Sequence, residues 1–475
     1  FTMRRLSHLT FCLAFLTTSL ASADDLRPLL RELSHEVVEN LMVVAPDRSV
    51  YGMAYEYKAM PDGPCVQAFG LDSMHDGAWM MSGMITAQRI DPGSSFLETA
   101  QKTFAPFYIN ILQNSDRLFP GMRPRKGQEE FTSPVKGWAP RGWDDGVGID
   151  LVPFLKGEVI PFSSGINSHP EDTFVERNED GSYRQSYHTS SHHLFQDLAD
   201  GLLNLWLTTH DPAATESVRL IQQTRTEIGR PLPVVNKALD LMSGKKPGAS
   251  QLFTFVDSKA FDPLWKGFVE KEKRTYSHYD DGLAWELRAQ IAEAALREDG
   301  ILDPQFVNHA VAKVYSMALV TKAFHGEQWQ PGMTLAPGFA SFENGKLVRK
   351  GAADSIIYAR GIQLPWIAAA VLPAFRKDGE SWNAAISEIT PKNLEAMKKG
   401  LAASGIELDL DHGNVVAELE NWIDGTIDYW SKVRTKKGYL PRMIKVEGDT
   451  YTWSKFMDLG SYAHMTKLIS FRQMD

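Results

Sequence analysis

The feature that most constrains the fold of this chain is a spacing of three or four residues between apolar side chains, which recurs along most of its length. Such a spacing places the apolar side chains on one face of an α-helix. It is clearest in four runs: Leu97, Ala100, Phe104, Phe107 and Ile111; Leu194, Leu198, Leu202 and Leu205; Val307, Val311, Val314 and Ala318; and Val415, Leu419, Trp422, Ile423 and Trp430. Further helices, about a dozen in all, are predicted at 27–44, 76–91, 213–228, 232–243, 282–298, 362–375, 391–404 and 453–470.

Strand signals are fewer and local. The turn pairs Asp180-Gly181 and Asn344-Gly345, and the turn Glu447-Gly448-Asp449, each predict a small β-hairpin. No fixed-period repeat, low-complexity tract or linker is visible, and the stretch 117–170, rich in proline and glycine, is expected to form a long loop within the domain.

Helices in successive hairpins, in a chain rich in Trp and Tyr, predict a mainly α fold with a few small β-hairpins. We expect one domain over residues 24–475, an (α/α)6 or (α/α)7 toroid in which an outer ring of helices surrounds an inner one. A right-handed solenoid of helix pairs is the alternative. In a toroid, loops and inner-helix ends meet at one mouth, where a ligand site is expected.

The first 23 residues have the three-part layout of a secretory signal peptide. Arg4 and Arg5 precede the apolar run 9–16, and the small residues that follow predict cleavage near Ala23. We therefore expect an exported protein, either periplasmic or secreted. Removal of two arginines and no acid would lower the net charge from −9 to −11.

Composition narrows the classes of partner. An acidic chain without a long Lys/Arg-rich run argues against nucleic acid as a partner, and no apolar stretch after the signal reaches the roughly 20 residues that span a bilayer.

Only Cys65 lies outside the signal, so no internal disulfide is expected. The 12 Trp, 14 Tyr and 24 Phe are enough for a large core with aromatic side chains left over, which favours a sugar ligand.

Histidines are concentrated in one part of the chain. His169, His188, His192 and His193 fall within 25 positions, and Asn167 lies close to the first of them. The Thr-Ser-Ser run at 189–191 predicts a helix N-cap, which places His192 and His193 in the first turn. There the helix dipole favours a neutral imidazole, which is suited to accept a proton or to hydrogen-bond a substrate carboxyl group. Simple capping or surface exposure is the alternative for each.

A second polar segment precedes the helix predicted at 282–298. It contains Arg274, Tyr276, His278 and Tyr279. A tyrosine beside cationic groups has a stabilised phenolate, so it can exchange protons with a sugar, and the planar fork of Arg274 can pair with a carboxylate. Packing of both tyrosine rings, with their hydroxyls on solvent, is the alternative.

These Asn, His, Tyr and Arg motifs, together with the helical pattern, resemble the toroidal uronic-acid polysaccharide lyases, the group that includes chondroitin, alginate and glucuronan lyases. Within it the chain looks most like the alginate and glucuronan lyases of polysaccharide lyase family 38. The resemblance implies an exported enzyme that cleaves a uronic-acid-containing polysaccharide by β-elimination and needs no cofactor. In that group an Asn/His/Arg set neutralises the uronate carboxylate and so acidifies the C5 proton, and a Tyr, alone or with His, performs the elimination.

The resemblance also implies roles for individual residues. The catalytic candidates, which move protons in that group, are Tyr276, Tyr279, His192 and His193. The substrate-binding candidates, which hold the uronate, are Asn167, His169, His188 and Arg274. In this assignment either tyrosine is the acid, either of the two histidines at the helix start is the base or a second neutraliser, and Asn167 or His169 is a neutraliser.

A glycoside hydrolase on the same fold is the first alternative. Such enzymes need two carboxylates from separate segments, about 5–9.5 Å apart. Asp-Asp-Gly occurs at 144–146 and at 280–282, and Asp145 with Asp281 is the pair we would choose. The same tripeptide is also ordinary turn and N-cap chemistry.

Two further alternatives concern metal and sugar binding. His188 and His192 are four residues apart and can ligate zinc, but no His-Glu-x-x-His motif or cysteine ligand accompanies them, so no metal is expected. A non-catalytic sugar-binding protein would use Trp138 and Trp143, in the long loop, as stacking platforms. For the lyase, the expected partner is an acidic polysaccharide substrate, and the oligomeric state is left open.

Overall fold

The structure is a computed structural model of the chain. It describes residues 25–42, 52, 54–61, 65–66, 71–118, 136–138, 175–177, 183–185, 192–227, 229–245, 259–265, 269–270, 274–276, 278, 280–335, 338–343, 346–350, 356–447, 450–453 and 456–474.

The described residues form a mainly helical protein, as the sequence predicts. The longer helices are α2 (Arg27–Leu41), α3 (Leu71–Ile90), α5 (Ala105–Leu118), α7 (His192–Thr209), α8 (Pro212–Glu227), α9 (Pro233–Met242), α11 (Asp281–Arg297), α12 (Pro304–His325), α13 (Gln363–Lys377), α14 (Gly379–Ser387), α15 (Pro391–Ala402), α16 (His412–Lys437) and α17 (Leu459–Met474). Short helical turns are α4 (Phe96–Thr99), η1 (Ala100–Phe104), η3 (Lys259–Phe261), α10 (Asp262–Leu264), η5 (Gly326–Gln328) and η7 (Ala359–Ile362).

Strands are short and lie in small antiparallel sheets. They are β1 (Tyr57–Ala59), β2 (Cys65–Val66), β3 (Val175–Arg177), β4 (Tyr183–Gln185), β5 (Arg274–Tyr276), β6 (Gly338–Glu343), β7 (Lys346–Lys350), β8 (Ile356–Tyr358), β9 (Met443–Glu447), β10 (Thr450–Trp453) and β11 (Phe456–Asp458). In the described residues the sheet orders are β11-β1-β2, β10-β9-β8, β5-β6-β7 and β3-β4.

The three predicted hairpins are confirmed. β3 pairs with β4, β6 with β7 and β9 with β10, each across the turn that the sequence marks. Turn chemistry is local, so a single sequence is enough to find these pairs. The sheets that join distant segments, such as β11 with β1, have no comparable local signal.

Several helices begin at a side-chain cap. Asp280 accepts a hydrogen bond from the backbone of Leu283 and starts α11, and Asp303, followed by a proline at the first helical position, starts α12. α16 ends at Gly438, whose φ of 78° is the left-handed conformation that closes a helix. These caps explain why the helix boundaries follow the sequence closely.

The helix predictions differ from the structure in places; for example, the helix expected over 76–91 begins at Leu71. The helix expected over 453–470 begins only at Leu459, because β10 and β11 occupy the preceding residues. The nine-residue α14 was not expected, although Asp378 caps it. Most of the loop expected at 117–170 lies outside the described residues.

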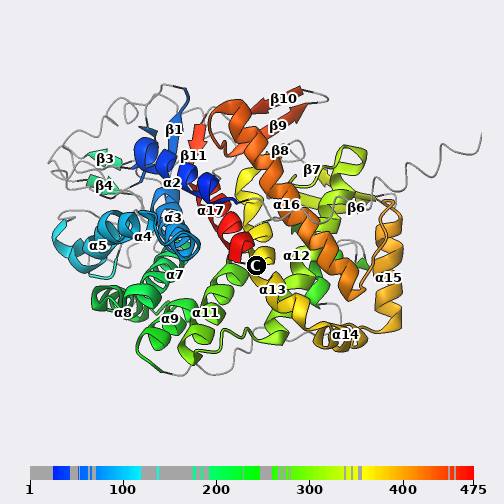
Figure 1. Ribbon diagram of the computed structural model, residues 1–475, viewed down its shortest axis with the longest axis horizontal. Coiled ribbons are helices and arrows are strands. Elements are labelled where there is room, and N and C mark those ends of the chain that lie inside the picture. The colour runs from blue at the N-terminus through cyan, green and yellow to red at the C-terminus, as the bar shows by residue number, and fades with distance from the viewer. Residues whose placement is uncertain are drawn as a thin grey trace, which may run out of the picture.

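A closed circuit of helices forms the centre of the described part of the chain. α3 packs against α7, α7 against α11, α11 against α13, α13 against α17, and α17 against α3 again. In Figure 1, α17 lies between α3 and α13. Other helices pack on this circuit from outside: α2 on α17, α8 and α9 on α7, and α12 and α16 on α13.

The core is continuous through both layers of helices and is rich in tryptophan. Trp382, Trp422 and Trp430 are among its largest buried side chains, so all three serve packing. Within the described ranges, no helix combines the length and apolar character needed to cross a membrane.

Candidate active site

The five helices of the central circuit present their N-terminal halves on the same side. Arg360, just before α13, contacts Asp76 in the second turn of α3 and Asp458 directly before α17. Gln363, the first residue of α13, donates to Asp281, the first residue of α11, over 2.8 Å.

The remaining link joins α11 to α7. Trp285 in the second turn of α11 donates its indole N–H to Asp197 in the second turn of α7, over 2.8 Å. All five helices therefore run in the same direction, and their positive dipole ends meet at what we call the N-terminal mouth.

A small enclosed cavity lies between these helices below the N-terminal mouth. Its volume is about 10 Å³, roughly the space of one water molecule. Its aromatic walls are Trp79, Trp285 and Trp366, from α3, α11 and α13. The residues that line it reach from the first turn of α11 and α13 to Lys467 in the third turn of α17 and Ile291 near the middle of α11, so the cavity lies in the N-terminal and middle turns of the circuit.

Three charged side chains at this cavity each have a polar atom that makes no hydrogen bond with the described residues. Lys467 is 2% exposed; among the described residues its Nζ makes no hydrogen bond or ion pair, and it lies 5.0 Å from the centroid of the Trp366 ring. Asp200 is 8% exposed, and its Oδ1 accepts no hydrogen bond from the described residues. Arg288 Nε lies 3.5 Å from Asp200 Oδ1 and donates no hydrogen bond.

Burial shifts the pKa of all three groups toward the neutral form. It lowers the pKa of Lys467 to about 8, against the opposing charge of Asp200. It raises the pKa of Asp200, although Arg288 and Lys467 act in the opposite direction, and it lowers that of Arg288. Shifts of this kind are typical of acid–base sites, and here they coincide with a cavity.

His464 completes the wall between α17 and α13. Its Nδ1 accepts a hydrogen bond from Trp366 Nε1 over 3.2 Å, and its ring lies 4.6 Å from that of Trp79. Because Nδ1 is the acceptor, a neutral His464 carries its proton on Nε2. Its position one turn before Lys467 places both side chains on the same face of α17.

Neutral polar side chains of α3 and α7 hold the guanidinium of Arg288 in place. Its Nη1 donates to Asn204 Oδ1 and its Nη2 to Ser82 Oγ, each over 3.2 Å. Asn204 in turn donates to the Ser82 carbonyl over 2.9 Å. The guanidinium is therefore fixed in position while its Nε edge faces Asp200.

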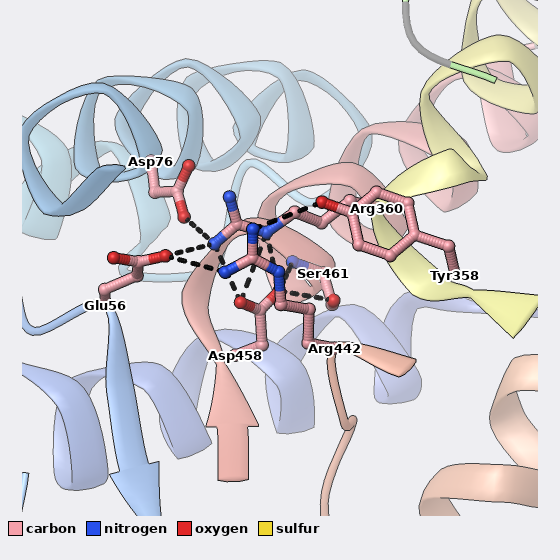
Figure 2. A network of polar contacts seen from close by, with 7 residues as sticks. All are labelled: Glu56, Asp76, Tyr358, Arg360, Arg442, Asp458 and Ser461. Carbon is pink, nitrogen blue, oxygen red and sulfur yellow. Dashed lines mark hydrogen bonds and ion pairs between the residues drawn. The ribbon is translucent and has the colours of Figure 1, made fainter. Parts of the chain in front are cut away.

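A fully buried ion network lies at the same end of the helices (Figure 2). Arg360 Nη2 lies 2.9 Å from Glu56 of the chain before β1, 2.5 Å from Asp76 of α3 and 2.8 Å from Asp458. Arg442 also donates to Glu56, over 3.1 Å.

Asp458 in this network also caps the last helix. Its Oδ2 accepts from the backbone N–H of Ser461 over 2.8 Å, which fixes the start of α17. At Gly460 a Cβ atom would lie 2.9 Å from both Arg360 Nε and Asp76 Oδ2, so only glycine fits beside the guanidinium. The network thus joins the N-terminal ends of α3, α13 and α17.

The same network contains the one set of possible metal ligands found among the described residues. Oxygen atoms of Glu56, Asp76 and Asp458 lie within 4.8 Å of one another. Arg360 Nη2 bonds to all three carboxylates, so a guanidinium already supplies the positive charge that a cation would bring. This arrangement favours a structural role.

Half of the twelve residues expected at the site lie outside the described residues. These are Asn167, His169, His188, Trp143, Asp145 and Tyr279. His192 and His193 are the first two residues of α7, as the capping signal predicts, and their backbone is therefore at the N-terminal mouth. Arg274 is described through its backbone, which pairs with Ala340 in the β5-β6 ladder.

Two expected residues are placed in the core. Tyr276 is 1% exposed, its hydroxyl donates to the Pro263 carbonyl over 2.7 Å, and its ring packs against Phe324. Trp138 is 2% exposed and belongs to the hydrophobic core. Neither placement fits the expected role: a buried, bonded hydroxyl is not poised for proton transfer, and a buried ring offers no sugar platform.

Asp281 is the expected residue that the structure does bring to the cavity. Asp200, Arg288, His464 and Lys467 were not singled out from the sequence, because they lie on helices identified by their apolar stripes. A signal was present: Asp197 and Asp200 in α7, and His464 and Lys467 in α17, are pairs of ionisable residues spaced three apart.

Comparison with known proteins finds no family model that matches the chain, and no match among curated proteins or solved structures.

Proposed function

We propose that α3, α7, α11, α13 and α17 are the inner ring of an (α/α) toroid. The closed circuit, the shared helix direction and the helices packed outside it support this arrangement. The described residues contribute five helices to the proposed ring, whereas the sequence pattern suggested six or seven pairs. The ligand site of such a ring is its N-terminal mouth and the cavity beneath it.

The proposed function is that of an exported polysaccharide lyase that cleaves a uronic-acid-containing polysaccharide, of the alginate or glucuronan type, by β-elimination. The observation that carries the proposal is the pair Lys467 and Arg288. Both are buried donors at one cavity, and among the described residues the Nζ of the first and the Nε of the second donate no hydrogen bond. Buried donors of this kind are matched by an acceptor-only group, and the carboxylate of a uronic acid is one.

The size of the cavity determines how a sugar would approach. A space of about 10 Å³ holds roughly one water-sized group, so we place one oxygen of the substrate carboxylate there and the sugar rings at the N-terminal mouth. C5 is bonded to the carboxylate carbon, so its proton would then lie at the cavity entrance. Removal of that proton forms the C4–C5 double bond as the C4–oxygen bond breaks.

Proton transfer in this proposal needs a base for C5 and an acid for the leaving oxygen. His192 and His193, which begin α7 at the mouth, remain the candidates for the base. Tyr279, which directly precedes Asp280, the cap of α11, remains a candidate for the acid. Asp200, whose pKa is raised by burial, is suited to give a proton to the leaving oxygen. Tyr276 has no part in this scheme.

A glycoside hydrolase is the second candidate, because the cavity brings together two carboxylates. Asp281, one member of the pair chosen from sequence, lines it together with Asp200. Asp200 would be the acid, because burial raises its pKa, and Asp281, held by Gln363, would be the base.

The test is to incubate the protein with alginate, glucuronan, chondroitin and polygalacturonate while recording both absorbance near 235 nm and reducing sugar. Elimination raises the absorbance, because it creates an unsaturated sugar, whereas hydrolysis releases reducing ends without it. An increase on one substrate that is lost in Asp200→Asn supports the lyase. Reducing sugar without absorbance favours the hydrolase, and binding without either product favours a sugar-binding protein.

A further inference from the structure

A second hollow lies on the outer surface, along one face of α16. It has a volume of about 640 Å³ and runs between α16 and the segment 330–333. Its polar and aromatic lining consists of Gln330, Asn421, Asp428, Tyr429, Lys432 and Lys436. We call this hollow the α16 groove. From residue 421 to residue 436 the helix rises roughly 22 Å, enough for several sugar units in a row.

The wall of the α16 groove is fixed by close backbone contacts. A Cβ on Gly425 would lie 2.1 Å from Pro331 Cβ, and one on Gly332, whose φ is +97°, would lie 2.5 Å from Tyr429 Cβ. Trp430 Nε1 donates to the Gly332 carbonyl over 3.1 Å. The two glycines let the segment approach the helix, and the hydrogen bond holds it there, so the groove is a built feature.

The chemistry of the lining suits a sugar chain. Tyr429 is half-buried and offers part of an aromatic face, while Gln330 and Asn421 supply amides that can bond hydroxyl groups. Two lysines and one aspartate line the groove, so its charge is positive in a chain whose net charge is −9. Lys432 is 73% exposed and pairs with Asp428 over 2.5 Å, a contact that an added anion can share.

We propose that the α16 groove is a second binding site, which holds an anionic polysaccharide chain away from the ring centre. The choice of glycan rests on the proposed function, but the groove shares no lining residue with the central cavity. α16 packs on the outer side of α13, and it crosses the near face of the molecule in Figure 1. A chain bound there would keep the protein on its polymer between reactions.

The experiment measures binding separately from turnover. The Lys467→Met chain, chosen to prevent cleavage, is run in native gels that contain alginate or polygalacturonate, with and without Tyr429→Ala and Lys432→Gln. We expect the double substitution to raise the dissociation constant about fivefold or more, because a stacking contact and a cation are lost. Tyr429→Phe, which keeps the ring, and Lys399→Gln, on the exposed face of α15, should leave retention unchanged.

Three results would overturn the proposal: no retention of the parent chain by either polymer, equal retention of the double variant, or loss of a dimer in the double variant by sedimentation. The last would assign the groove to contact between copies of the chain. Initial rates on a trisaccharide should stay within twofold in the double variant made without Lys467→Met. If no substrate is cleaved but retention still depends on Tyr429, the proposed function fails and the groove assignment stands.

Discussion

The side chain of Lys467 ends in an ammonium group, and almost every other residue of α17 around it is buried. Burial lowers its pKa to about 8, so part of the folding free energy is spent on holding it there. Below pH 8 the native state carries this buried charge at a cost. Between pH 8 and 10.5 the unfolded chain binds more protons than the native one, so the free energy of unfolding rises with pH and the penalty disappears.

Lys467→Met should therefore stabilise the protein at pH 7. The gain is up to about 3 kcal/mol, the equivalent of the pKa shift, and it should vanish above pH 10.5. Urea unfolding at both pH values measures it, with Lys399→Met as the exposed control. A less stable variant at pH 7 would show that the ammonium group serves packing.

Tyr276 is a residue for which the structure and the sequence-based prediction disagree. Its hydroxyl donates to the Pro263 carbonyl inside the core. Tyr276→Phe should lower the free energy of unfolding by about 1–2 kcal/mol, because it leaves that carbonyl without its donor. Activity on any cleaved substrate should stay within about twofold, and a large loss of activity in a folded variant would restore Tyr276 as a catalytic candidate.

Single residues of the site were harder to predict than the helices that carry them. Asp281 was found because Asp-Asp-Gly is a local motif. Asp200 and Lys467 were missed because each lies on a helix that was identified by its apolar spacing. Their meeting depends on contacts between segments more than 260 residues apart, which one sequence does not reveal.

At the scale of elements, the ion network around Arg360 decides how the N-terminal ends of α3, α13 and α17 meet (Figure 2).

Helices and hairpins were predictable because the signals that mark them are local: apolar spacing, caps and turns. The junctions between them were not. Glu56 and Arg360 are 304 positions apart, and nothing near either residue marks the other as its partner.

Arg360→Met should destabilise the fold by about 3–5 kcal/mol, because three buried carboxylates lose their shared cation. Urea unfolding measures the change. Arg376→Met removes a half-exposed pair with Glu420 and should cost less than about 1 kcal/mol. Similar losses in the two variants would contradict the role assigned to the network.

Acid should unfold the protein partly through Asp458. Burial alone would raise the pKa of this carboxyl, but Arg360 and Arg442 hold it below the ordinary 3.8. A lowered pKa contributes stability above pH 3.8 that is lost as the pH falls further. Thermal unfolding between pH 7 and 2 should therefore show a smaller acid-induced loss in Asp458→Asn than in the parent, and parallel curves would disprove the assignment.

At the scale of the whole molecule, the mainly helical fold with small hairpins was predicted and is confirmed, whereas the toroid expected from the sequence stays a proposal. A toroid and a solenoid of helix pairs have the same local pattern, and they differ in whether the last helix returns to the first. Here α17 packs on α3, which closes the described circuit. That closure places Lys467 beside Asp200 and Arg288 and so creates the site.

The central claim is that this closed ring holds the substrate carboxylate at its centre. The most direct measurement is the initial rate at 235 nm on the best uronate polysaccharide, for the parent, Lys467→Met and Tyr276→Phe. The account predicts a loss of about 10²-fold or more in kcat/KM for Lys467→Met and less than about twofold for Tyr276→Phe. The reverse order, with Lys467→Met active and Tyr276→Phe inert although folded, would contradict it.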